Sequence, residues 1–331
     1  MTFDSAYIDG ARNAVRALGV RPGEKVSVIT DQQSEEIAAA ISAEIELAGG
    51  GFTRWVLEDT VPRPIATIPD AIVRDLDGAN ACVAVVVIRA DEPEMCRALA
   101  DLVMGRGVRY LNLSGVDRRT MLESMRADYA LVDRFCTRML DMLKDGGTIR
   151  AANPAGTQIS AHVNGGWHKN SGVVPGASQV SLPAGEIWTA PESVDGIYVA
   201  DGVISNYFAE RFGDIRYTPL EITIANSEIA GLRCENADLR AEFDAVVNTG
   251  GKASRVSELA IGANTMLYDI SGNIVQDSKI PGVYLSFGDS SRSGDNAGSG
   301  CASQIQVIGR FFDAWINDVQ FLSNAKFVIP S

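Results

Sequence analysis

The chain has 331 residues, of which 46% are hydrophobic, and its 29 basic and 42 acidic residues give a net charge of −13. That apolar content supports a large buried core, and the length predicts two domains. An acidic surface repels phosphate backbones and anionic lipid, so neither nucleic-acid binding nor membrane-surface binding is expected.

The numbers of cysteines and histidines limit which cellular compartment and which kinds of metal site are expected. Five cysteines are scattered without a CxxC pair, which argues against a disulfide framework and against a cysteine zinc site. No run approaches the roughly 20 apolar residues of a membrane span, and the N-terminus lacks the features of a signal peptide. We therefore expect a cytoplasmic protein. Because His162 and His168 are the only histidines, one chain cannot supply three histidine ligands.

Residues 1–146 alternate strand and helix patterns, which predicts an α/β N-terminal domain with a mostly parallel sheet. The segment 81–88 is apolar on both faces, as expected of a central parallel strand. Ser34, followed by Glu35 and Glu36, is expected to cap a helix. The predicted strands are 25–30, 52–57, 81–88 and 108–113, and the predicted helices are 35–48, 92–106, 121–124 and 131–144.

Residues 147–331 differ in composition and in pattern. Gly, Ser, Asn and Pro become frequent, and short strand patterns follow one another. This change predicts an α+β C-terminal domain over 147–331. The predicted strands are 148–151, 158–163, 197–200, 220–225 and 284–287; a helix is predicted over 236–247 and a late helix or strand–helix element over 304–318.

Four phrases follow one another in the second half: SLPAGEIWTAP (181–191), SELAIGAN (257–264), DSKIPG (277–282) and YLSFG (284–288). This series resembles the thermophilic metallo-aminopeptidase family, of the aminopeptidase T and S type, and its relative 2,5-dihydroxypyridine 5,6-dioxygenase. The resemblance implies a C-terminal domain of the metallo-aminopeptidase type and a homo-oligomer. It also implies a metal that activates water or oxygen.

By that resemblance, Glu186 and Glu258 stand at the glutamates of the first two motifs. The other ligand positions of the family are replaced. The usual Asp-Glu-Lys is Asp277-Ser278-Lys279, a histidine is Tyr284, and His-x-Asp is Gln306-Val307-Ile308. Tyrosine and glutamine bind divalent metals poorly at neutral pH, and isoleucine cannot bind them. We therefore predict a degenerate metal site and assign no metal ligand and no cofactor, with a divalent metal left open.

We predict Glu186, Glu258, Tyr284 and Cys301 as the catalytic residues. Two carboxylates that converge in a cleft can serve as acid and base. A cysteine between small residues is open to approach and can act as a nucleophile. Three of them have a plainer alternative: a strand-edge carboxylate for Glu186, an ion pair with Arg255 for Glu258, and a packed thiol for Cys301.

The segment 288–301, GDSSRSGDNAGSGC, supplies backbone N–H donors and hydroxyls of the kind that bind anionic or carbonyl ligands. Its arginine suits a substrate carboxylate, although a flexible surface loop is the alternative for this composition. His168 is expected to orient substrate or to act as a base, with a structural role as its alternative. The predicted substrate-binding residues are His168, Asp289, Ser290, Ser291, Arg292 and Gln306.

These observations predict an enzyme with a small-molecule substrate. The first hypothesis is a hydrolase that opens a small amide or the ring of a nitrogen heterocycle. Three alternatives stay open: a metal-dependent aminopeptidase with rearranged ligands, an iron-dependent ring-cleaving dioxygenase, and a binding protein without catalysis. The expected partner is a further copy of the chain, with no nucleic acid and no membrane.

Overall fold

The structure is a computed structural model that describes residues 4–87, 89, 91–92, 94–172, 179–205, 207–288 and 304–329. The described residues form two compact units, and the chain passes between them more than once. The first unit contains 4–128, Gly172 and 179–184, and the second contains 129–171, 185–288 and 304–329. The sequence predicts a boundary at residue 146, which lies inside the second unit.

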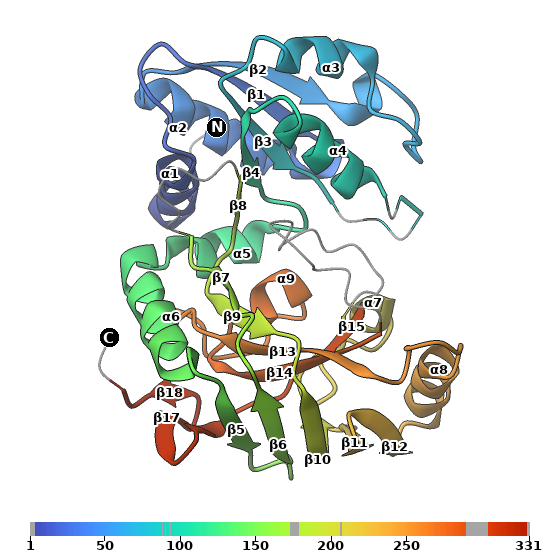
Figure 1. The fold of residues 1–331 in the computed structure, drawn as a ribbon. Coiled ribbons are helices and arrows are strands. Elements are labelled where there is room, and N and C mark those ends of the chain that lie inside the picture. Colours follow the sequence, from blue (N-terminus) through green and yellow to red (C-terminus); the bar gives the residue numbers. More distant parts are fainter. Residues whose placement is uncertain are drawn as a thin grey trace. The chain divides into compact units, whose positions relative to one another are not determined.

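The first unit is built on a parallel five-stranded sheet in the order β2-β1-β3-β4-β8 (Figure 1). This is the parallel α/β region that the first half of the sequence predicts. The strands are β1 (Lys25–Thr30), β2 (Gly51–Val56), β3 (Ala81–Val85), β4 (Arg109–Asn112) and β8 (Gln179–Ser181), and the helices are α1 (Ser5–Leu18), α2 (Glu35–Leu47), α3 (Asp70–Leu76), α4 (Met95–Met104) and α5 (Arg118–Leu122).

Local sequence explains how these elements begin and pack. Every residue of β3 is buried, as the apolar run predicts for a central strand. Helix α1 was not predicted, yet it buries Tyr7, Ala11 and Leu18 on one face. The expected cap at Ser34 is wrong in its detail. The Ser34 side chain makes no capping bond, and Asp31 instead accepts from the Ser34 N–H at 2.9 Å.

The second unit contains two antiparallel sheets. The larger sheet has the order β12-β11-β10-β6-β5-β16-β17-β18, and the smaller one has the order β15-β14-β13-β9-β7. The larger sheet has the strands β5 (Gly147–Ala152), β6 (Gln158–Val163), β10 (Ser193–Ala200), β11 (Leu220–Ala225), β12 (Glu228–Arg233), β16 (Asp313–Ile316), β17 (Val319–Ser323) and β18 (Lys326–Phe327). The smaller sheet has the strands β7 (His168–Asn170), β9 (Glu186–Thr189), β13 (Val256–Gly262), β14 (Gly282–Gly288) and β15 (Gln304–Val307), and the helices are α6 (Tyr129–Leu143), α7 (Tyr207–Phe212), α8 (Ala237–Val247) and α9 (Ile274–Asp277).

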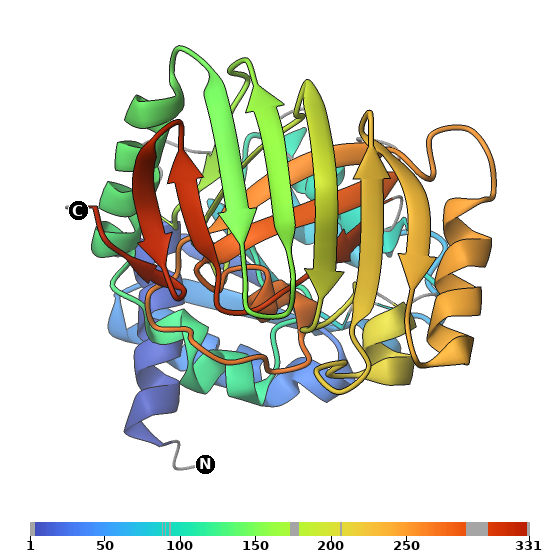
Figure 2. The ribbon, with the colours of Figure 1, turned by 90° about the horizontal axis from the view of Figure 1, so that it is seen from below.

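The two antiparallel sheets are stacked, and Figure 2 shows the smaller one behind the larger one. Tyr198 on β10 joins them directly, because its hydroxyl donates to the carbonyl oxygens of Val283 at 3.1 Å and Val307 at 3.0 Å. Both acceptors belong to strands of the smaller sheet, so this buried hydroxyl fixes where the sheets meet.

A late helix or strand–helix element was predicted over 304–318. The helix in this prediction is wrong, because the segment forms β15, a short loop and β16. The burial of β16 alternates, with Ala314 and Ile316 buried while Asp313 and Trp315 are partly exposed. That period of two is typical of a strand with one covered face. No helix within the described ranges is long and apolar enough to cross a lipid bilayer.

Candidate functional site

The smaller sheet of the second unit has one polar face, which follows from its strand register. Residues directly opposite each other in an antiparallel pair point to the same side, and so do residues two apart along one strand. Glu258 lies opposite Ser286, which lies opposite Gln306. Further along, Gly262 lies opposite Glu186. All these side chains therefore project from the same face.

Four of the predicted site residues share that face with His168. Glu186, Glu258, Tyr284 and Gln306 are buried there although three of them are polar or charged residues that usually stay in water. The opposite face of β13 and β14 carries Leu259, Ile261, Val283, Leu285 and Phe287. The sheet thus separates an apolar face from a face with polar groups kept away from solvent.

Glu258, Ser286 and Gln306 form one row across three neighbouring strands. The Ser286 hydroxyl donates to Glu258 Oε1 at 3.4 Å. Gln306 is only 8% exposed, and its Nε2 has no hydrogen-bond partner among the described residues. A buried amide N–H without an acceptor is costly, so this donor is suited to a bound group. Its backbone is held in place, because the Gln306 N–H donates to Ser205 Oγ at 2.9 Å.

The alternative in which Glu258 forms an ion pair with Arg255 does not agree with the structure. Arg255 instead pairs with Glu228 at 3.9 Å. Arg255 precedes β13, and its side chain is half-exposed, whereas Glu258 is buried on the polar face. Glu258 therefore does not form the surface ion pair that this alternative describes.

Glu186 lies at the other end of the polar face, against a lysine. Lys279 Nζ lies 2.5 Å from Glu186 Oε1, and both side chains are buried. The pair balances the charge of Glu186, which buried carboxylates require. Glu186 is therefore a buried member of a charge pair and not the strand-edge carboxylate that the sequence alternative describes.

The segment between β13 and β14 delivers Lys279 to this position. The Asn264 N–H donates to the Lys279 carbonyl oxygen at 2.9 Å and closes the segment at its base. Asp277 accepts from the Ser271 N–H at 2.8 Å and the Gly272 N–H at 2.8 Å, which folds the intervening loop. A Cβ at Gly262 would lie 1.9 Å from the Ile280 carbonyl oxygen, so glycine permits this close approach.

Tyr284 has a structural role in this arrangement. Its hydroxyl donates to the Ile280 carbonyl oxygen at 2.6 Å, and its ring packs edge-on against Phe312. Burial raises the pKa of the Tyr284 hydroxyl well above its ordinary value. The hydroxyl is already engaged as a donor and does not ionise near neutral pH, so the geometry gives no support to the predicted catalytic role.

His168 lies at the edge of the same sheet. It occupies β7, opposite Trp188, and the two rings are stacked with centroids 5.5 Å apart. The imidazole is exposed while the indole is buried. His168 and Trp188 therefore pack against each other on the polar face of the smaller sheet.

The remaining predicted site residues lie outside the described residues. They are Asp289, Ser290, Ser291, Arg292 and Cys301. Their roles stay predictions.

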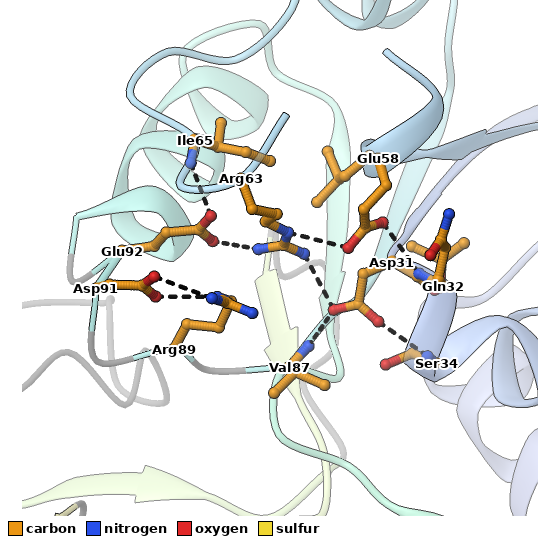
Figure 3. A network of polar contacts seen from close by, with 12 residues as sticks. Asp31, Gln32, Ser34, Glu58, Arg63, Ile65, Val87, Arg89, Asp91 and Glu92 are labelled. Carbon is orange, nitrogen blue, oxygen red and sulfur yellow. Dashed lines mark hydrogen bonds and ion pairs between the residues drawn. The ribbon is translucent and has the colours of Figure 1, made fainter. Parts of the chain in front are cut away.

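A second charged cluster lies in the first unit, at the carboxyl end of its parallel sheet (Figure 3). Arg63 donates to Asp31 at 3.2 Å and to Glu58 at 3.1 Å, and it pairs with Glu92 as well. Asp31 follows β1 and Glu58 follows β2. Asp31 also accepts from the Val87 N–H, beyond β3, at 2.6 Å. One guanidinium therefore ties together the loops after three strands.

The strand order reverses between β1 and β3, and doubly wound sheets commonly bind ligands outside the strand ends at such a point. Here the protein's own Arg63 occupies that place and is nearly buried. A neighbouring cavity of about 150 Å³ is lined in part by Asp91, Glu92 and Glu94. Its acidic lining disfavours a phosphate, so we assign this cluster a structural role.

The chain has the fold of two enzymes of known structure. It matches 2,5-dihydroxypyridine dioxygenase from Pseudomonas putida with a TM-score of 0.67 and 15% identity, over 98% of this chain and 97% of that chain. It matches AmpT from Thermus thermophilus with a TM-score of 0.66 and 14% identity, over 99% of this chain and 100% of that chain. No family model and no curated protein matches the sequence. The predicted resemblance is confirmed as a likeness of fold.

The resemblance implies a metal, and the donors on the polar face do not fit one. Within the described ranges, no three histidine, cysteine, aspartate or glutamate side chains are placed to hold a metal ion together. The carboxylate of Glu186 faces an ammonium at 2.5 Å, and a divalent cation at that oxygen would be repelled by it. We therefore derive no step through a metal.

Two residues of the polar face were not predicted as site residues. Lys279 stands at the lysine of the family's Asp-Glu-Lys run but was given no role, and nothing in the local sequence indicates that its ammonium reaches Glu186, 93 positions earlier. Ser286 belongs to the phrase YLSFG. The alternation of that strand places a hydroxyl on the same side as Tyr284, and this signal is present in the sequence.

Proposed function

We propose that the chain is a hydrolase of small amides, the amide bonds of nitrogen heterocycles included, in which Glu258 and Gln306 are the central residues. The observation that carries the proposal is the row Glu258–Ser286–Gln306. It combines a buried carboxylate with a buried amide donor that has no acceptor among the described residues. General-base catalysis and stabilisation of a developing oxyanion need these two groups.

The spacing of the row suits a small substrate. Neighbouring strands lie about 4.8 Å apart, so the backbones of Glu258 and Gln306 are separated by roughly 10 Å across β14. Ser286, between them, is a short side chain. A carbonyl group above Ser286 has the carboxylate on one side and the amide N–H on the other.

In the proposed reaction Glu258 accepts a proton from a water molecule as the water oxygen attacks the carbonyl carbon. The Gln306 N–H donates to the carbonyl oxygen as negative charge develops there. The C–N bond then breaks, and the proton held by Glu258 passes to the leaving nitrogen. The products are a carboxylic acid and an amine, which remain joined when the amide belongs to a ring.

The ion pair of Lys279 with Glu186 lies further along the same face. Glu186 is opposite Gly262, four positions along β13 from Glu258, which corresponds to about 13 Å at the backbone. The two glutamates therefore do not act on one atom of a small substrate. The pair supports the proposal as a fixed polar contact for the far end of the substrate.

Two observations concern the alternatives of a non-catalytic binding protein and an iron-dependent dioxygenase. Both enzymes with this fold show that the scaffold carries catalysis in other proteins. An iron site with histidine ligands has little support here, because His162 is exposed on β6 of the larger sheet and contacts Thr148 at 3.0 Å. His168 lies on a strand of the other sheet.

The test measures hydrolysis of linear amides, lactams and cyclic imides. Mass spectrometry detects the products, and each reaction is run with and without a chelator. We expect Glu258→Gln to lower kcat about 100-fold or more. Gln306→Met, which keeps the side-chain volume, should lower kcat by a similar factor with a small change in KM. Glu228→Gln is the matched control on an exposed glutamate and should keep full activity.

Two results would contradict the proposal. Hydrolysis that the chelator abolishes and an added divalent metal restores would assign the chemistry to a metal. Full activity of Glu258→Gln in a folded protein would remove the proposed base.

A further inference from the structure

The strand β15 is an edge strand of the smaller sheet, and a short segment of the chain lies along its outer side. β15 pairs with β14 on its inner side. On its outer side Ile204 forms an isolated antiparallel bridge with Val307. The Ile308 N–H donates to the Val203 carbonyl oxygen at 3.0 Å. The segment 203–205 therefore holds β15 from the side that faces away from the rest of the sheet.

Ser205, the last residue of this segment, bonds to both backbone groups of Gln306. The Ser205 N–H donates to the Gln306 carbonyl oxygen at 2.9 Å, and the Gln306 N–H donates to Ser205 Oγ at 2.9 Å. In a regular antiparallel pair the second bond goes to a backbone carbonyl. Here a side-chain hydroxyl replaces that carbonyl, shortly before α7 begins at Tyr207. Ser205 is buried, so loss of its hydroxyl would leave a buried N–H without an acceptor.

The bonds to Ser205 also determine how Gln306 pairs with Ser286 on β14. The backbone N–H and C=O of Gln306 both point toward Ser205. Gln306 and Ser286 are therefore an antiparallel pair without mutual backbone hydrogen bonds. In such pairs the Cα atoms lie about 4.5 Å apart instead of about 5.5 Å, and the side chains are closer. The bonds to Ser205 thus favour a short distance between the Gln306 side chain and the centre of the polar row.

The carboxamide of Gln306 depends on its backbone for its position. Its Nε2 is buried, and no acceptor for it lies among the residues that the structure describes. A side chain extends from its backbone in one of a few staggered rotamers, so a shift of the backbone moves the tip as well. The bonds that hold the backbone therefore control where the carboxamide N–H points.

We propose that Ser205 is a positioning residue, which holds the Gln306 carboxamide where its N–H meets the developing oxyanion. This inference rests on the proposed function. Ser205 acts through Gln306 and contacts neither the substrate nor the reacting atoms. A donor stabilises an oxyanion only when it is already in place, and a misplacement of about 1 Å strongly lowers the rate. The Ser205 hydroxyl therefore contributes to the chemical step and not to substrate binding.

The larger sheet contains the same arrangement at Ser227, which provides a matched control. The Ser227 N–H donates to the Val194 carbonyl oxygen at 3.0 Å, and the Val194 N–H donates to Ser227 Oγ at 3.0 Å. Ser227 is also buried. Ser227→Ala therefore removes the same kind of backbone contact as Ser205→Ala, but from the other sheet.

Steady-state kinetics of amide hydrolysis compare these variants. Ser205→Ala should lower kcat at least about tenfold and change KM by less than about twofold, because the donor acts in the transition state. Ser227→Ala should keep the wild-type kcat. The double variant Ser205→Ala/Gln306→Met should be no slower than Gln306→Met, since the donor that Ser205 positions is then absent. Circular dichroism establishes that each variant is folded.

Nuclear magnetic resonance gives a readout that does not depend on hydrolysis. Protein with isotope-labelled glutamine shows the side-chain amide signals, and the signal of Gln306 is the one that Gln306→Met lacks. Ser205→Ala should shift or broaden this signal, whereas Ser227→Ala should leave it unchanged. Ser205→Cys keeps the size of the side chain with a weaker acceptor, so it should move the signal less, and it replaces Ser205→Ala if that variant does not fold.

Two results would overturn the role of Ser205. One is a Gln306 signal that Ser205→Ala leaves unchanged. The other is a loss of kcat that is as large in the Gln306→Met background as in the wild type, because Ser205 would then act independently of Gln306. A wild-type chain that hydrolyses no amide would contradict the proposed function instead. The Gln306 signal alone would then decide whether Ser205 positions the carboxamide.

Discussion

Lys279 and Glu186 form the most completely buried ion pair of the second unit that the structure describes. Desolvation of both groups is costly, and their mutual attraction offsets it only while both are present. The intact pair therefore adds little net stability, whereas removing one partner would leave an uncompensated charge in the protein interior. The Lys279 segment is also anchored at its base, because the Asn264 N–H donates to the Lys279 carbonyl oxygen.

The first prediction concerns this pair. Lys279→Met removes the ammonium and leaves the Glu186 carboxylate in the protein interior, which should lower the free energy of unfolding by about 3–5 kcal/mol. Urea denaturation measures the change. Arg97→Met is the control, because Arg97 and its partner Glu94 are both exposed, and it should cost less than about 1 kcal/mol.

The double variant Glu186→Leu/Lys279→Met separates charge burial from packing. It should recover most of the stability lost by Lys279→Met, because no charge is left uncompensated. If the double variant is no more stable than the single one, the lysine acts through its aliphatic stem and not through its charge.

The second prediction concerns pH and Asp133 on α6. Burial alone raises the pKa of this carboxyl, but hydrogen bonds from Lys169 at 2.8 Å and Ser171 at 2.5 Å outweigh it and hold the pKa below its ordinary value. A lowered pKa stabilises the folded protein above the ordinary pKa, and the contribution disappears as pH falls through the folded-state pKa. Asp133→Asn should therefore cost about 1 kcal/mol at pH 7.

The pH profile of unfolding distinguishes this effect from a packing defect. The difference in stability between wild type and Asp133→Asn should shrink as the pH falls below about 4, where the wild-type carboxyl becomes protonated. A difference that stays constant between pH 7 and pH 3 would show that the charge is not responsible.

Sequence reasoning finds single residues when the strand pattern carries them. Glu186, Glu258 and Gln306 were predicted, and strand register brings them to one face. Lys279 was missed because its partner lies far away in sequence and its position depends on a loop closed by tertiary hydrogen bonds. The engagement of the Tyr284 hydroxyl was missed for a similar reason, because its acceptor is a backbone carbonyl in that same segment.

At the scale of elements, Arg63 joins the loops after β1, β2 and β3, which the hydrogen bonds from the Gln32 N–H to Glu58 and from the Val87 N–H to Asp31 also connect. Arg63→Met should lower the free energy of unfolding by about 3–5 kcal/mol, because carboxylates such as those of Asp31 and Glu92 remain buried without the guanidinium. Arg89→Met is the control at an exposed arginine that pairs with Asp91, and it should change stability by less than about 1 kcal/mol.

Hydrogen exchange locates the effect of Arg63→Met. Amides in the loops after β1 and β3 should lose protection first. One of them is the Val87 N–H, which donates to Asp31. Equal loss in the second unit would contradict a local role for this cluster.

Strands were predicted well where apolar residues alternate or run together, as in β1, β6 and β11, whose bounds agree with the sequence prediction. The helix predicted within 304–318 is wrong because two short strands and a loop share its apolar residues. Helix α1 was overlooked although Tyr7, Ala11, Ala14 and Leu18 recur at helical spacing. Short strands such as β7 and β8 carry too few residues to give a pattern.

For the whole molecule, the fold class was predictable but the course of the chain through the units was not. The sequence separates a parallel α/β region from a region of antiparallel strands, and both are present. Composition changes near residue 146, whereas the units exchange chain at 128 and again near 172 and 185. Helix α6 belongs with β9 of the second unit, and β8 pairs with β4 of the first. These are tertiary pairings that composition does not record.

That course of the chain predicts the behaviour of fragments. A cut after residue 146 leaves α6 in the first fragment with the face that contains Val132, Cys136 and Met139 uncovered, and it removes β8 from the edge of β4. We expect neither 1–146 nor 147–331 alone to unfold cooperatively in urea, because each lacks part of both units.

The two fragments refolded together should form a one-to-one complex with a cooperative transition, since β8 can then pair with β4 and α6 can cover β9. Fragments cut at residue 128 serve as a comparison, because α6 then stays with the second unit and only β8 is displaced. The fragment 129–331 should therefore be the more cooperative of the two C-terminal fragments. A sharp unfolding transition for 1–146 alone would mean that β8 and the second unit contribute little to the first, and that composition marks the physical boundary better than tertiary contacts do.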